Sequence, residues 1–69
     1  MNKLEQLRQA IDAVPAGYRG LWGAMSLLLS EGELGTLRAY VRGARTMALH
    51  LTSDEPLLKA LSDIEELLK

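Results

Sequence analysis

The chain has no cysteine and no phenylalanine, and only one histidine, one tryptophan and two prolines among its 69 residues. Without cysteine it cannot form a disulfide, bind zinc through thiolates or use a catalytic thiol. His50 has no second histidine to share a metal, and the acidic residues do not form the run of alternating carboxylates that binds calcium. We therefore predict no metal and no cofactor. A domain this small usually needs disulfides, a bound metal or oligomerisation for stability. With the first two excluded, we expect oligomerisation to stabilise the fold.

A strong net charge and long apolar runs are missing too. The net charge is -1 at pH 7, which argues against general attraction to nucleic acid or membrane surfaces. The most apolar stretch, residues 21–29, is far shorter than the roughly 20 residues that cross a bilayer. The opening sequence MNKLEQLRQAID mixes both charges, so we expect no signal peptide and a cytoplasmic location by default.

Apolar residues recur every three or four positions along the whole chain, and no stretch alternates as a strand does. Glycine, proline and capping residues divide this pattern into helices near residues 2–13, 16–30, 33–51 and 54–68. We predict a single all-α domain over residues 1–69. It is a small bundle of three to four short helices, with the hairpin 16–30/33–51 as its centre, completed by dimerisation.

Capping residues stand at the predicted helix ends. Asn2 with Glu5, and Ser30 with Glu33, have the spacing of capping pairs. Thr52 or Ser53 is the expected N-cap of the last helix, which has Pro56 in its first turn.

The helix predicted over residues 16–30 is apolar or small on almost every side. Its glycines lie opposite its large apolar residues on a helical wheel, and a strip of small residues flanks the apolar face of the next helix. Small residues four apart let two helix backbones approach closely. We therefore predict close helix packing and self-association; the alternative is that Gly17 and Gly20 only mark an irregular helix start. The predicted self-association residues are Gly20, Ala24, Leu27, Ala39 and Gly43.

Four residues are candidates for binding a partner. Trp22 is expected in the core or in a dimer seam, and alternatively as an exposed anchor for a foreign partner. Arg38, Arg42 and Arg45 form one stripe on the helix 33–51, with no acidic residue between Glu33 and Asp54. Arginine binds phosphate or carboxylate bidentately. Two alternatives stay open for the stripe: a solvated face, or pairing with the acidic last helix.

No catalytic arrangement stands out. The nearest candidate is His50 with Ser53 and Asp54 at a helix junction. A structural role as capping residues at this junction accounts for them better than a catalytic role does. The glycines of GYRGLWG do not follow a strand, so they do not form a phosphate-binding loop. We predict that the protein is not an enzyme and has no catalytic residues.

Two segments, AIDAVPAGYRGL and GTLRAYVRGAR, resemble pieces of the promoter-reading helix-turn-helix region of extracytoplasmic-function sigma factors. Together they span about a third of the chain, and such a resemblance implies a recognition helix that docks in a DNA groove. The residues that would form the first helix of that motif, between the two pieces, are missing here.

The sequence thus favours a small non-enzymatic helical protein that acts by protein–protein interaction, as an adaptor, accessory subunit or inhibitor, and as a homodimer. The alternative is a regulator that binds nucleic acid through the arginine stripe. The acidic excess of residues 53–69, five acidic against two basic side chains, favours a protein partner because it would repel a polyanion.

Overall fold

The computed structural model describes residues 2–69, and this range contains no β-strand. Its helices are α1 (Lys3–Asp12), a short 3-10 helix η1 (Ala16–Tyr18), α2 (Arg19–Ser30), α3 (Leu34–Leu51) and α4 (Glu55–Leu67). The predicted all-α fold is confirmed. The second α-helix begins three residues later than predicted, because residues 16–18 form the tighter 3-10 turn. Met1, which the predicted domain includes, lies outside the described residues.

Two helix starts are capped by side chains. The Asn2 Oδ1 accepts a hydrogen bond from the Glu5 N–H at 2.8 Å, as predicted. The cap of α4 is Asp54, whose Oδ1 accepts from the Leu57 N–H at 3.3 Å. Both predicted candidates for this cap, Thr52 and Ser53, are therefore wrong. The Thr52 Oγ1 instead accepts from the Asp54 N–H at 3.1 Å and holds the capping residue in place.

The turn between α2 and α3 differs from its prediction. The Ser30–Glu33 capping box does not form, because Glu33 is itself the N-cap of α3 and its side chain makes no capping hydrogen bond. Gly32 has a φ of +72°, a conformation that side chains disfavour. Glycine at this position lets the chain reverse within a few residues.

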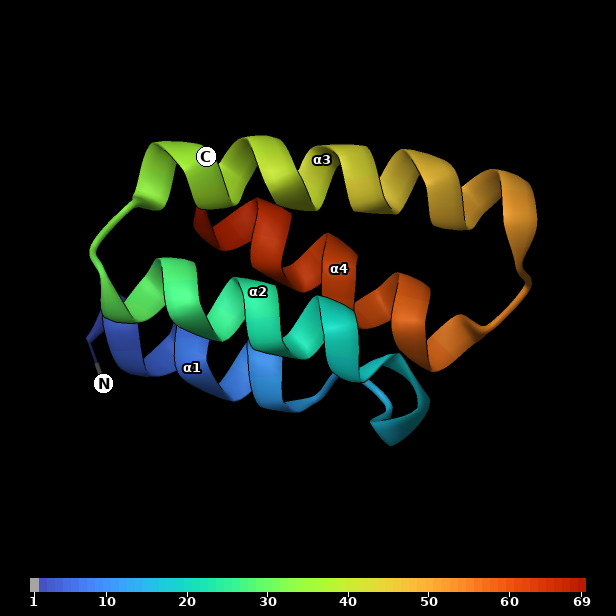
Figure 1. Cartoon of the computed structure of the whole chain (residues 1–69), viewed down its shortest axis with the longest axis horizontal. Coiled ribbons are helices and arrows are strands. Elements are labelled where there is room, and N and C mark those ends of the chain that lie inside the picture. Colours follow the sequence, from blue (N-terminus) through green and yellow to red (C-terminus); the bar gives the residue numbers. More distant parts are fainter. Residues whose placement is uncertain (1) are drawn as a thin grey trace.

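The four α-helices form an up-down-up-down bundle (Figure 1). Within the described chain each helix packs against two neighbours, in the ring α1–α2–α3–α4–α1, and the diagonal pairs lie apart. Short connections between consecutive helices favour this antiparallel arrangement. The predicted hairpin is present as α2 and α3, and α1 and α4 close the ring behind it (Figure 1).

The core lies along the axis of the bundle. α4 supplies four of its buried side chains, whereas α2 supplies only Met25. The accessible surface is 4400 Å², while an unfolded chain of this mass exposes about 11,000 Å². Folding thus buries about 60% of the surface, the ordinary value for a domain of this size. The buried side chains are Leu7, Ile11, Val14, Met25, Leu37, Val41, Ala48, Leu57, Ala60, Leu61 and Ile64.

Candidate interaction surface

A groove runs along the side of α3 that faces Leu21 of α2, Tyr18 of η1 and Leu57 of α4. It consists of two hollows, of about 350 and 500 Å³, which share Leu21, Ala44 and Met47 and are therefore continuous. None of the residues that line it is charged. We name it the α2/α3 groove, and its lining residues are Tyr18, Leu21, Ala39, Tyr40, Gly43, Ala44, Met47, Ala48, Leu51, Thr52 and Leu57.

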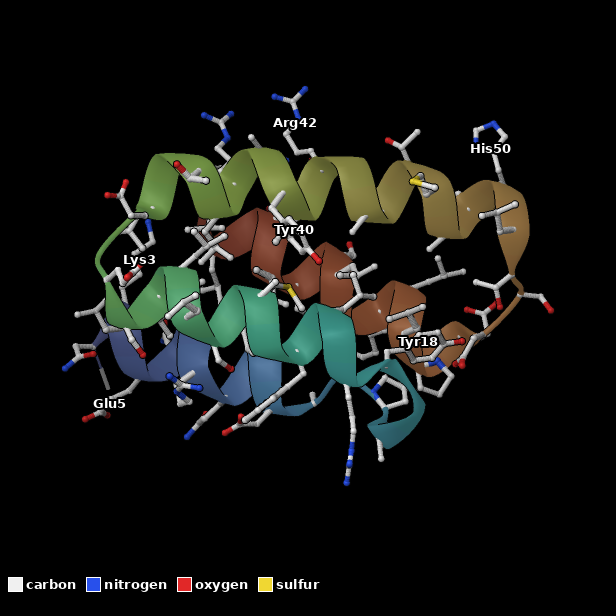
Figure 2. All side chains as sticks on the ribbon, viewed as in Figure 1. Lys3, Glu5, Tyr18, Tyr40, Arg42 and His50 are labelled. Atoms are coloured by element: carbon white, nitrogen blue, oxygen red, sulfur yellow. The ribbon has the colours of Figure 1, made fainter. Side chains whose placement is uncertain are left out.

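Large apolar side chains at this groove are open to water. Met47 is 62% exposed and Leu51 is 76% exposed. Figure 2 shows that Tyr40 extends from α3 toward α2, whereas Arg42 points away from the bundle. Complete burial of a side chain such as methionine contributes up to about 1.5–3 kcal/mol. The α2/α3 groove therefore offers apolar surface that a bound partner would remove from water.

The structure separates the five predicted self-association residues into two groups. Ala39 and Gly43 line the α2/α3 groove. Gly20, Ala24 and Leu27 lie on α2 outside its lining; Gly20 is exposed and Ala24 is half-buried. Leu27 is 58% exposed. These three residues thus leave part of α2 open to water, but the groove itself lies mainly along α3, because Leu21 is the only α2 residue in its lining.

The glycines do not serve close packing within the chain. A methyl group at Gly20, Gly23 or Gly43 would have no packed neighbour within 4 Å. That part of the prediction is wrong, because the helices of one chain meet through larger side chains such as Met25, Leu37 and Val41.

Trp22 is not a core residue. Its side chain is 43% exposed, and its Nε1–H donates to the Asp12 Oδ1 at 3.0 Å. The expectation of burial within the monomer is wrong because Trp22 lies at the edge where α2 meets the end of α1, beside Pro15 and Arg19. It does not line the α2/α3 groove, so the two features are distinct. An anchoring role for Trp22 stays a prediction.

Two arginines of the stripe lie beside Glu65 of α4. The Arg45 Nη1 lies 2.9 Å from Glu65 Oε2, and the Arg42 Nε lies 3.9 Å from Glu65 Oε1. The Glu65 side chain is only 19% exposed. The stripe was predicted either to be a solvated face or to pair with the acidic last helix. Arg42 and Arg45 make this pairing. Arg38 is exposed and makes no ion pair within residues 2–69.

The three polar residues of the α3–α4 junction do not form a catalytic chain. The His50 Nδ1 lies 2.8 Å from the Thr46 carbonyl oxygen, and Ser53 makes no side-chain hydrogen bond within the described residues. Asp54 has a partner that the sequence pattern did not indicate. The Tyr18 hydroxyl donates to Asp54 Oδ2 at 2.9 Å across 36 positions of sequence.

This hydrogen bond joins the α1–α2 connection to the α3–α4 connection. It ties η1, before α2, to the N-cap of α4, and Figure 2 shows Tyr18 at that end of the molecule. The hydrogen bond to Asp54 raises the pKa of Tyr18 above its usual value, and desolvation adds to this effect. The periodicity of the sequence gives no indication of this partner, because contacts between distant residues have no local signal.

The described residues contain neither a cluster of metal ligands nor a membrane-spanning helix. In residues 2–69 no three histidine, aspartate or glutamate side chains converge as metal ligands. No helix in this range has the length and apolar character needed to cross a membrane. No protein-family model matches the chain, and no curated protein or solved structure matches it either.

The segments that resemble sigma-factor pieces lie around the α1–α2 connection and in α3. α2 and α3 are antiparallel neighbours in the bundle (Figure 1).

Proposed function

We propose that the protein is a small non-enzymatic helical binding protein, an adaptor, accessory subunit or inhibitor, that acts through protein–protein contacts at the α2/α3 groove. The main support is the uncharged lining of this continuous groove. A contiguous exposed apolar surface on a small protein is typical of a site that binds another protein. Binding would remove Met47 and Leu51 from water, and both are now mostly exposed.

The charge distribution favours a protein partner over nucleic acid. Nucleic-acid affinity depends chiefly on cationic side chains that neutralise phosphates. The α2/α3 groove has none, and Arg42 and Arg45 of the stripe already face Glu65. Because α4 places this carboxylate beside the stripe, a polyanion would have to compete with it.

The chemistry of the lining supports a binding role over a catalytic one. Its only side-chain polar atoms are the hydroxyls of Tyr18, Tyr40 and Thr52. Catalysis by acid–base or nucleophilic groups needs a titratable residue tuned near neutral pH. The Tyr18 hydroxyl is held by Asp54 and its pKa is raised, which makes it a poorer base or nucleophile at pH 7.

The proposal is tested by site-specific crosslinking in cells. A photo-reactive residue replaces Ala39, which lines the groove, or Leu49, which is 58% exposed and lies outside it. We expect a protein adduct from position 39, with a second copy of this chain or with a different protein, that is absent at position 49 and survives nuclease treatment. Equal adducts at both positions, or adducts that nuclease removes, would contradict the proposal.

A further inference from the structure

We infer that the occupant of the α2/α3 groove is a second copy of this chain, packed through α3 in an antiparallel two-fold pair. The inference rests on the proposed function, because it uses the same groove. It adds the identity of the partner and the positions that meet: Met47 of one copy lies over Ala39 of the other, and Gly43 lies close to the two-fold axis.

The size of the face fits a second copy. The bundle measures 30 × 20 × 20 Å, so its long face projects to about 600 Å², and the accessible surface of a corrugated face is larger. A stable complex buries about 800 Å² on each partner. A single partner helix about 10 Å across would cover only half of the 20 Å width. A second bundle of the same dimensions covers the whole face.

The shape of α3 is self-complementary. Met47 is 62% exposed and projects from the helix. One and two turns earlier, Gly43 and Ala39 leave a shallow recess, and the space above Gly43 is empty within 4 Å. In a two-fold pair, if residue i contacts residue j then j contacts i. A crossing near Gly43 therefore places each Met47 in the recess at the other copy's Ala39, and a flexible thioether fills such a recess well.

The charges permit this pairing. Two copies of one surface bring like charges together wherever the surface is charged, and such contacts oppose association. The lining of the α2/α3 groove has no charged residue, and α2 has none from Gly20 to Ser30. Arg42 is not part of the lining, and its Nε lies 3.9 Å from Glu65 Oε1. Identical faces can thus meet without repulsion at their centre.

The absence of cysteine from the chain allows a direct test by disulfide formation. The variants are Gly43→Cys, the double variant Ala39→Cys/Met47→Cys, and the control Leu49→Cys. Positions 39 and 47 lie about 12 Å apart along one helix, beyond the roughly 7 Å limit for a disulfide, so any bond between them joins two chains. With a mild oxidant we expect about tenfold more covalent dimer from Gly43→Cys and from the double variant than from the control. Equal yields in all three would overturn the inference.

A second test needs no cysteine. Sedimentation equilibrium of the wild-type chain should show a mass that rises from 7.6 kDa toward twice that value with concentration. Met47→Glu should raise the dimer Kd about tenfold or more, equivalent to about 1.4 kcal/mol. Leu49→Glu is the matched control, because its side chain is similarly exposed (58% against 62%) on the same helix and outside the groove. Similar effects of the two substitutions would overturn the inference.

These results separate the inference from the proposed function. A wild-type mass of 7.6 kDa up to about 1 mM, a concentration at which only about 4 kcal/mol of binding free energy is needed, would refute the second copy. If position 39 still crosslinked another protein in cells, the proposed function would stand. If position 39 crosslinked only to another copy of this chain, the second copy would be supported and a foreign partner at the α2/α3 groove would be excluded.

Discussion

Glu65 on α4 accepts a hydrogen bond from Arg45 on α3, with 2.9 Å between Oε2 and Nη1. The other oxygen of the same carboxylate lies 3.9 Å from the Nε of Arg42. One acidic side chain of the last helix therefore faces two members of a stripe that looks purely basic in the sequence. Arg42 and Arg45 thus pair with the last helix at the α3–α4 contact, whereas Arg38 makes no ion pair within residues 2–69.

Removal of the Glu65 carboxylate should weaken the fold slightly. Arg45 is 40% exposed, so we expect Glu65→Gln to lower the free energy of unfolding by only about 0.2–1 kcal/mol, the range of partly solvated ion pairs. A double-mutant cycle with Arg45→Ala, followed by urea denaturation, measures the coupling. The more exposed pair Lys59–Asp63 is the comparison and should show weaker coupling. Equal coupling in the two cycles would argue against a special role for Glu65.

The wild-type protein should not bind generic duplex DNA with sub-micromolar affinity at about 150 mM salt, because few of its cations are free to displace counterions. An electrophoretic shift assay compares it with the Arg38→Ala/Arg42→Ala/Arg45→Ala variant. A tight shift that the triple variant loses would favour the nucleic-acid alternative. In that case about three phosphate contacts per chain, doubled in a dimer, would give a log–log salt slope near -5.

Gly43→Ala should stabilise the folded monomer. The added methyl group meets no packed neighbour, and alanine is the better helix former by about 0.8–1 kcal/mol. Gly32→Ala is the paired comparison: the φ of +72° at this turn should make the same change destabilising, by about 1 kcal/mol or more. Thermal denaturation at low protein concentration measures both. A lower Tm for Gly43→Ala would indicate a packed contact in the monomer that we do not find.

The Tyr18–Asp54 hydrogen bond should contribute a pH-dependent part of stability. The pKa of Tyr18 is raised in the folded state; this contribution is therefore complete below the unfolded tyrosine pKa of about 10. It decreases as the pH rises above that value and is lost beyond the folded pKa. Urea denaturation of wild type and Tyr18→Phe should show a difference in stability that is constant near neutral pH and shrinks above about pH 10. A difference that does not change across this range would contradict the assigned hydrogen bond.

The sequence alone was sufficient to predict the helices and where most of them begin and end. Apolar residues every three or four positions define one inward-facing side for each helix, and Asn2 and Pro56 are local signals for helix starts. Such patterns act within a few residues, so they can be read without knowing the fold. The all-α bundle and its α2/α3 hairpin follow from them.

The burial of individual side chains, the surroundings of the glycines and the groove depend on which sides of the helices meet, and only the tertiary structure determines this. On a helical wheel Trp22 shares a side with Met25, yet Met25 is fully buried in the core, whereas Trp22 is 43% exposed and hydrogen-bonded to Asp12 at the end of α1. The glycines of α2 and α3 were predicted at helix crossings and instead face open space. The α2/α3 groove combines one side of α3 with Leu21 of α2, Tyr18 of η1, Thr52 of the α3–α4 connection and Leu57 of α4. Its shape and lack of charge depend on how the four helices turn about their axes, which long-range packing determines and local sequence does not.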